Sequence, residues 1–254
     1  MTPQFPQTLW VVRHGQSAGN VARDAAEAQG LHVIDIPTRD IDVTLSDLGR
    51  QQSESLGRWF GDLAPAARPE VVLCSPYVRA AETARLLLRS AAIAGHVTLR
   101  MDERLREKEF GILDRLTYFG IQKKYPELSE QRSHVGKFYF RPPGGESWCD
   151  VILRLRSLLE MITREYAGKR VLVVAHQVIV NCMRYLVEQM DEAQILGIDR
   201  LGDVPNCAVT SYVLAPGEND NGLLKLELVN FLAPLEQAGT PITSEPDAAT
   251  TAKP

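Results

Sequence analysis

Three short apolar runs, each followed directly by polar residues, constrain the fold of this chain more than any other feature. They cover residues 9–12, 71–74 and 171–175, and they are followed by "RHG", "SP" and "HQ". Continuous apolar runs of this length are typical of strands that are covered on both faces, as in a parallel sheet. The runs therefore predict a buried sheet with polar side chains where its strands end.

Amphipathic helical patterns lie between these runs. Apolar residues recur at helical spacing over residues 45–63 and 77–88, and most clearly after "PPGGES", from Trp148 to Ile162. Ser147 and Asp150 resemble a capping box at the start of this last helix. Alternating strands and helices predict an α/β fold, a three-layer α/β/α sandwich around a mostly parallel sheet. Two further β-like runs, residues 208–214 and 223–232, predict a hairpin.

The domain organisation follows from where this alternation holds. Residues 1–236 are expected to form a single domain. Within it, residues 104–145 are charged, aromatic and punctuated by Pro and Gly, so we interpret them as a small insertion, the lid segment. From Gln237 the chain lacks large apolar residues apart from Ile242, and residues 237–254 are expected to be a disordered tail.

Composition narrows the class of protein. The chain of 254 residues has 28 Lys and Arg against 32 Asp and Glu, a formal charge of -4, which argues against nucleic-acid binding. An acidic protein can still hold a locally positive pocket for an anionic substrate. The four cysteines are far apart and form no CxxC pair, so neither a zinc site nor a disulfide framework is expected. With neither a signal peptide nor a membrane-spanning run expected, we predict a cytoplasmic protein.

Polar residues at the three strand ends form the candidate site. Ligands of open α/β sheets bind outside the carboxyl ends of the strands. If the three strands are neighbours, Arg13, His14, Arg79 and His176 converge there. Arginine forks match phosphate oxygens, and helix N-termini add backbone donors, so the group suits a phosphate. Taken singly, each histidine is more often a structural hydrogen-bonding residue, and each arginine a solvated one; their concurrence favours the phosphate site.

These residues carry a resemblance to a known family. "RHGQSAGN" resembles the signature of the histidine phosphatase superfamily, in its phosphoglycerate-mutase-like branch. "TLSDLGRQQ", "CSPYVRAAETA", "LREKEFG", "PPGGES" and "VLVVAH" resemble further family segments, and they occur in the family's order. The resemblance covers roughly residues 9–180, and the whole set is specific where "RHG" alone is weak.

The resemblance implies a role for each matching residue. His14 would be the nucleophile, and Arg13, Arg79 and His176 would complete the phosphate pocket. Asn20 would be a further phosphate contact, and Gln16 and Ser17, from the same stretch, are candidate phosphate or substrate contacts. An imidazole nitrogen that attacks phosphorus splits one difficult displacement into two easier ones, and preorganised arginines can stabilise the transferring charge without a metal. Neither a metal nor an organic cofactor is implied.

The same resemblance makes Glu107 the proton donor, provided that burial raises its pKa. Glu109 is the rival acid, because alternation within an extended segment would place both carboxylates on one face. Glu107 is preferred because it follows "LR", as the family's acid does. At Gln177 the chain departs from the family, which generally has glycine after the second histidine; Gln177 either restricts the backbone there or contacts the substrate.

Three functions stay open at this stage. A metal-independent phosphomonoester hydrolase with a small phosphorylated substrate is favoured, because the lid segment resembles that of less specific phosphatases. A cofactor-dependent phosphoglycerate mutase, which transfers phosphoryl groups between glycerate isomers, is the first alternative. A catalytically silent module that binds a phosphorylated ligand or a protein is the second. The physiological substrate and the oligomeric state, including a homodimer, stay open.

Overall fold

The computed structural model describes residues 5–215 and 223–245. The strands of these residues form one six-stranded sheet in the order β3-β2-β4-β1-β5-β6. Strands β1 (Thr8–Arg13), β2 (Val71–Cys74), β3 (Thr98–Met101) and β4 (Arg170–Ala175) pair in parallel. The hairpin of β5 (Val209–Leu214) and β6 (Leu224–Phe231) pairs antiparallel to β1. The predicted parallel strands and hairpin are confirmed, and β3 is an additional edge strand.

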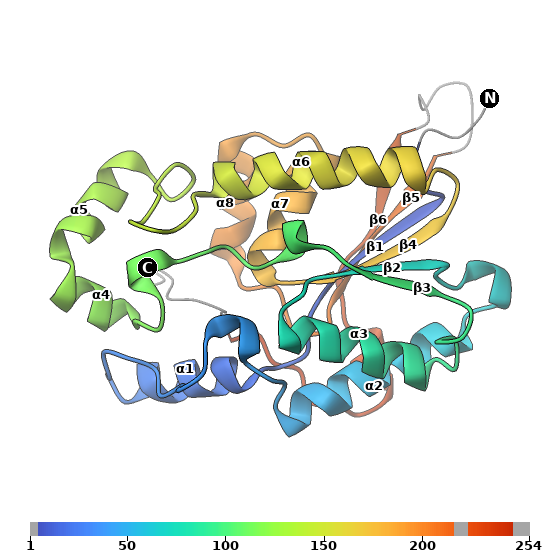
Figure 1. Ribbon diagram of the computed structural model, residues 1–254, viewed down its shortest axis with the longest axis horizontal. Coiled ribbons are helices and arrows are strands. Elements are labelled where there is room, and N and C mark those ends of the chain that lie inside the picture. Colours follow the sequence, from blue (N-terminus) through green and yellow to red (C-terminus); the bar gives the residue numbers. More distant parts are fainter. Residues whose placement is uncertain (1–4, 216–222, 246–254) are drawn as a thin grey trace.

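Helices cover both faces of the sheet, as Figure 1 shows. Helices α6 (Trp148–Glu165) and α7 (Gln177–Val187) lie on one face, and α2 (Asp47–Asp62) and α3 (Val78–Ser90) lie on the other. Alternate residues of β1 enter the two cores: Leu9 and Val11 pack on the α6 side, Trp10 and Val12 on the α2 side. The α/β sandwich is therefore confirmed, and every residue of β1 from Leu9 to Val12 is buried because both faces are covered.

The remaining helices lie around this core. They are α1 (Ala18–Ala28), α4 (Tyr118–Lys124), α5 (Pro126–Val135), α8 (Glu192–Leu201) and α9 (Ala233–Gln237). Ser147 and Asp150 form the expected capping box at the start of α6. None of the helices in the described part of the chain is long and apolar enough to cross a membrane.

The lid segment holds a small apolar cluster of its own. Leu113, Leu116 and Phe140 form its buried centre, and α4 and α5 contribute Ile121 and Leu128 to its rim. Figure 1 shows α4 and α5 standing apart from the sheet, beyond the ends of its central strands. Part of the segment therefore packs beside the α/β core, while Leu105 and Phe138 pack into the core itself.

The tail from Gln237 differs from the expectation of disorder as far as Glu245. Thr240 and Thr243 form hydrogen bonds with Ser55 and Asn206, at 2.7 and 2.9 Å between side-chain oxygens. Hydrogen bonds of backbone and side-chain polar groups thus hold this segment, which lacks large apolar residues. Residues 246–254 lie outside the described residues.

Candidate active site

The carboxyl ends of β1, β2 and β4 bring the expected residues together. Because β4 lies between β2 and β1, the residues that follow these strands meet at one edge. The His14 and His176 rings are 5.1 Å apart between centroids, and Arg79 reaches His14 from the first turn of α3. Arg13, His14, Arg79 and His176 are each at most 2% exposed. The predicted convergence of two histidines and two arginines is present.

Hydrogen bonds define the state of the His14 imidazole. Arg79 Nε lies 3.2 Å from His14 Nε2. A guanidinium can only donate, so Nε2 accepts and carries a lone pair. The proton then sits on Nδ1, which donates to the Gly15 carbonyl at 2.6 Å. This tautomer leaves Nε2 as the nitrogen that could attack a phosphorus atom.

Backbone contacts hold His14 at the end of its strand. Its N–H donates to the Ala175 carbonyl at 2.9 Å, and Asn206 Nδ2 donates to its carbonyl at 3.0 Å. His176 Nε2 and Ser75 Oγ are 2.7 Å apart, which ties the end of β4 to the end of β2. Sequence reasoning missed Asn206, since it lies nearly two hundred residues from His14 and belongs to no local pattern.

Both arginines of the site contact other parts of the chain. Arg79 Nη1 donates to the Asp40 carboxylate at 2.9 Å, and its guanidinium carbon lies 5.1 Å from the centre of the Tyr77 ring. Arg13 donates to the carbonyls of Val204 and Glu245. Asp40 and Glu245 are acidic residues, and they contact the two arginines that are expected to bind phosphate. The sequence contains no signal for either contact.

The remaining candidates of the first loop surround the same place. Ser17 caps α1, and the Asn20 side chain completes this capping box, so part of their role is structural. Asn20 Nδ2 also donates to the Glu245 carbonyl at 3.2 Å, and Gln16 Nε2 donates to Glu245 Oε1 at 2.8 Å. The amide groups of Asn20 and Gln16 therefore contact Glu245, as Arg13 does.

The two candidate acids lie in different environments. Glu107 is 1% exposed and lines a cleft, and its Oε1 accepts from the Lys108 N–H at 2.7 Å. Glu109 is exposed and accepts from the Tyr77 hydroxyl at 2.9 Å. The segment is not a regular strand, so the alternation that would have placed both on one face does not apply. Burial and the cleft distinguish Glu107 from its rival.

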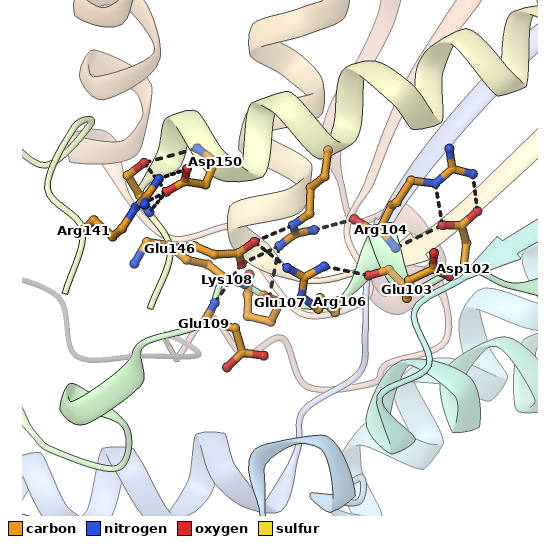
Figure 2. A network of polar contacts seen from close by, with 12 residues as sticks. Asp102, Glu103, Arg104, Arg106, Glu107, Lys108, Glu109, Arg141, Glu146 and Asp150 are labelled. Carbon is orange, nitrogen blue, oxygen red and sulfur yellow. Dashed lines mark hydrogen bonds and ion pairs between the residues drawn. The ribbon is translucent and has the colours of Figure 1, made fainter. Parts of the chain in front are cut away.

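An ion-pair network fixes the segment that carries Glu107 (Figure 2). Arg154 of α6 bonds to Glu146 at 2.9 Å and to the Glu107 carbonyl at 3.3 Å, and Arg106 bonds to Glu146 at 2.6 Å. Burial acts to raise the pKa of Glu146, but the guanidiniums of Arg154 and Arg106 hold it below its ordinary value. The backbone of Glu107 is thus tied to the start of α6. The side chain of Glu109 points away from this network in Figure 2.

Gln177 lines the same cleft as Glu107. Its Nε2 donates to Asp203 Oδ1 at 2.6 Å, which ties the start of α7 to the loop that carries Val204 and Asn206. Arg13 and His14 are hydrogen bonded to that loop. The residue that replaces the expected glycine therefore has a structural contact, in addition to its place in the cleft wall.

The described residues contain no group of three or more His, Cys, Asp or Glu side chains arranged to hold a metal ion. Arginines, histidines and amides supply the hydrogen-bond donors of the site, beside the carboxylates of Asp40, Glu107 and Glu245. Such a set of donors recognises a tetrahedral oxyanion through charge-assisted hydrogen bonds. With a nucleophilic imidazole nitrogen in the same place, the arrangement suits phosphoryl transfer.

Comparison with known proteins agrees with this geometry. Residues 9–226 match the family model described as histidine phosphatase superfamily (branch 1). A 2,3-bisphosphoglycerate-dependent phosphoglycerate mutase of Gloeobacter violaceus is 35% identical over 209 residues, covering 80% of this chain and 84% of that protein. A 6-phosphofructo-2-kinase/fructose-2,6-bisphosphatase of Caenorhabditis elegans is 31% identical over 180 residues. That match covers 70% of this chain and 34% of the nematode protein.

A solved structure described as mycobacterial hydrolase 1 has the same fold. Its TM-score is 0.67 at 25% identity, over 89% of this chain and 98% of that one.

Proposed function

The chain belongs to branch 1 of the histidine phosphatase superfamily, and on this premise we propose that it is a metal-independent phosphomonoester hydrolase that acts through a phosphohistidine on His14. The observation that carries the proposal is the hydrogen bond from Arg79 Nε to His14 Nε2 at 3.2 Å. It holds the lone pair of the nucleophile beside a cation that can bind the phosphate under attack. The superfamily comprises phosphatases and mutases that act on small phosphorylated substrates.

The proposed reaction has two displacements. In the first, His14 Nε2 forms a bond to phosphorus while the bond to the leaving oxygen breaks, and Glu107 gives that oxygen a proton. In the second, Glu107 takes a proton from water, whose oxygen attacks the phosphohistidine and releases phosphate and free His14. Arg13, Arg79 and His176 would stabilise the charge on the phosphoryl oxygens in both steps. The burial of Glu107 in the cleft supports its role as the acid and base.

The first test is phosphate release from p-nitrophenyl phosphate in excess chelator. We expect turnover that survives chelation and that falls by about 10³-fold or more in His14→Ala, because the covalent route is lost. His96→Ala is the matched control, since His96 is an exposed histidine outside the site. Turnover that persists in His14→Ala would refute the assignment of the nucleophile, and turnover lost to chelation would refute metal independence.

A phosphoglycerate mutase is a second candidate, favoured by the 35% identity to the Gloeobacter violaceus protein. A mutase must transfer the phosphoryl group back to a glycerate before water reaches it. With 3-phosphoglycerate as substrate, and with and without 2,3-bisphosphoglycerate, a hydrolase releases inorganic phosphate and a mutase forms 2-phosphoglycerate. We expect inorganic phosphate as the main product; conversion between the isomers at the higher rate would replace our proposal with the mutase.

A further inference from the structure

The cleft that Glu107 lines is rich in charged groups, with five cations beside the carboxylates of Asp40, Glu107, Asp114 and Asp199. Its walls include Arg23, Lys108, Arg115, Arg132 and Lys137, together with apolar side chains of the lid segment such as Phe110 and Phe140. Three of the cations have partners within the chain. Lys137 pairs with Asp199, Arg23 donates to the Leu116 carbonyl at 3.1 Å, and Arg115 donates to the Ile36 carbonyl at 2.8 Å. Lys108 and Arg132 are the exceptions.

Lys108 is a buried cation that forms no salt bridge in the described part of the chain, although the carboxylates of Glu107 and Glu146 act to raise its pKa. The residue is 8% exposed, and its Nζ contacts the face of the Phe110 ring, 4.3 Å from the centroid. A cation–π contact offsets only part of the cost of removing an ammonium from water. Burial, followed by the charge of Arg132, lowers the pKa of Lys108 to about 8.

Arg132, on α5, lines the same cleft and is half-buried. Among the described residues its guanidinium forms neither an ion pair nor a hydrogen bond. Burial lowers the pKa of Arg132, and Asp199 only partly compensates. The Asp199 carboxylate is paired with Lys137, so its charge is shared between the two cations.

From this pair of desolvated cations we infer that Lys108 and Arg132 bind a second anionic group of the substrate, in the cleft that leads to Glu107. The two cations repel each other, and neither forms a salt bridge among the described residues, so an anionic group bound between them would stabilise both. The substrate class is then a phosphomonoester whose leaving group carries a carboxylate or a further phosphate. This inference rests on the proposed function, because it takes the phosphate that is cleaved to lie at His14.

The test compares substrates that differ only in the second anion. Phenyl phosphate has none, 4-carboxyphenyl phosphate carries a carboxylate, and hydroquinone bisphosphate carries a second phosphate. For each, kcat/KM is measured with the wild-type chain, with Lys108→Met and with Arg132→Gln. The ratio of kcat/KM with and without the second anion is compared between chains, which cancels differences in leaving-group chemistry. Lys123→Met is the matched control, because Lys123 is an exposed lysine of α4 outside the cleft.

We expect the second anion to raise kcat/KM by about tenfold or more in the wild type and in Lys123→Met. This advantage should fall by at least about tenfold in Lys108→Met and in Arg132→Gln. Of the two substrates that carry a second anionic group, the one with the higher kcat/KM identifies the chemistry of that group. An advantage that is absent in the wild type, or that both variants retain, overturns the inference.

A binding measurement separates this inference from the proposed function. Calorimetry with His14→Ala compares phenyl phosphate and 4-carboxyphenyl phosphate without any turnover. Tighter binding of 4-carboxyphenyl phosphate supports the second anion site if it is lost when Lys108→Met is added to His14→Ala. This holds even if the wild type hydrolyses neither compound. Equal binding of the two compounds overturns it even if both are hydrolysed.

The C-terminal segment gives an independent observation. Residues 240–245, which we call the strap, run along α2 and end at the phosphate-binding candidates. Gln52 Nε2 donates to the Pro241 carbonyl at 2.9 Å, and the Asn206 N–H donates to the Thr243 carbonyl at 2.8 Å. At the end of the strap the Glu245 carbonyl accepts from both Arg13 and Asn20. Backbone and carboxylate oxygens of Glu245 thus sit where phosphate oxygens are expected.

The surroundings of the Glu245 side chain do not favour a permanent contact at this site. Its Oε1 accepts from Gln16, but Oε2 is buried and forms no hydrogen bond in the described residues. A buried carboxylate oxygen without a donor destabilises the arrangement that holds it. A phosphate that replaced it would bring more oxygens to the same donors.

We propose that the strap occupies the phosphate site of the ligand-free chain and leaves it when phosphate binds. Phosphate affinity is then reduced by the fraction of molecules in which the strap is seated. The proposal also rests on the phosphate site of the proposed function.

Hydrogen exchange of the full chain with and without inorganic phosphate tests the strap. We expect phosphate to speed exchange at the Asn206 N–H, because its acceptor belongs to the strap. Slower exchange there would show that the strap closes over the ligand, and unchanged exchange with bound phosphate would show that it stays; either overturns the proposal.

Calorimetry of phosphate binding gives the second measurement. Thr240→Val and Thr243→Val should bind inorganic phosphate several-fold tighter than the wild type, since each removes a side-chain hydrogen bond that holds the seated strap. Ser244→Ala is the control, because Ser244 is exposed beside them. Unchanged affinity in both variants overturns the strap proposal alone, and binding absent from every chain overturns the phosphate site as well.

Discussion

At the scale of single residues, the two carboxylates of the 107–109 segment differ in surroundings although they are two positions apart. Glu107 is buried in the cleft, and Glu109 is exposed and bonded to Tyr77. A carboxyl group in a water-poor cleft can deliver a proton to a leaving group, whereas an exposed one competes with solvent.

This difference predicts unequal effects of neutralising each acid. We expect Glu107→Gln to lower kcat for phenyl phosphate, whose basic leaving group needs a proton, by about 10²–10⁴-fold, the usual share of general acid–base catalysis. Glu109→Gln should lower it less than about tenfold, since it removes only a contact to Tyr77. Steady-state kinetics over a range of pH checks both. The reverse order would make Glu109 the acid.

Lys108 links stability to pH. Its pKa is lowered from 10.5 to about 8 by burial, so between these values the folded chain binds fewer protons than the unfolded one. Stability therefore rises with pH across this window, and the cost of the buried charge is present in full below pH 8. We expect Lys108→Met to stabilise the ligand-free protein at pH 7 by roughly 1–3 kcal/mol.

Melting temperatures between pH 6.5 and 10.5 check this prediction. The advantage of Lys108→Met over the wild type should shrink above pH 8. An advantage that does not change with pH would show that packing, and not the buried charge, is responsible. Lys123→Met, at an exposed lysine, should show neither effect.

At the scale of elements, the start of α2 packs directly against the loop that follows β1. A Cβ on Gly49 would lie 1.9 Å from the Gln16 carbonyl oxygen, and one on Gly15 would lie 2.4 Å from the Gly49 oxygen. Two glycines face each other here because no side chain fits between these backbones. The contact sets where the loop after His14 runs.

Gly49→Ala is therefore expected to destabilise the chain by about 1–3 kcal/mol through overpacking. It should also lower kcat/KM, because Gln16 and its neighbours must shift. Thermal unfolding and phosphatase activity of the same sample measure both effects. Gly197→Ala in α8 is the control, since a Cβ there would have only the Arg200 side chain nearby, at 3.9 Å. A stable, active Gly49→Ala protein would contradict this account of the contact.

At the scale of the whole molecule, the lid segment has an apolar cluster of its own and also reaches the core, where Leu105 and Phe138 belong to the cluster on the α6 face. Its cluster around Phe140 is distinct from the two clusters that cover the faces of the sheet. The part of the segment around this small cluster can open locally at a lower free energy than global unfolding. The cleft of Glu107 lies against this part of the segment, so local opening changes the site.

Truncating one buried side chain in the core and one in the lid segment separates global unfolding from local opening. Leu155→Ala, in α6, should lower the free energy of unfolding by about 2–5 kcal/mol. Phe140→Ala should leave global stability less affected, speed hydrogen exchange over residues 113–140 and raise KM. Urea denaturation and exchange on the two variants check this. Equal loss of global stability in both would mean that the lid segment unfolds only with the core.

The residue pattern alone was sufficient to predict much of the fold of this protein. Apolar runs, helical spacing and the capping box predicted the parallel strands, the hairpin and α6, because these signals are local and the sheet is buried on both faces. The edge strand β3 was not predicted, since an edge strand with exposed residues has no continuous apolar run. The convergence of Arg13, His14, Arg79 and His176 followed from the rule for strand ends.

Only the tertiary structure showed which distant residues surround that site. Asp40, Asn206 and Glu245 reach the two arginines and His14 from segments whose own sequence contains no catalytic motif. The same holds for Lys108 and Arg132, whose lack of a salt bridge among the described residues is seen only when the neighbouring segments are placed. The physical reason is that a local pattern records which face of an element is apolar, while hydrogen bonds and charge pairing depend on chain segments that folding brings together.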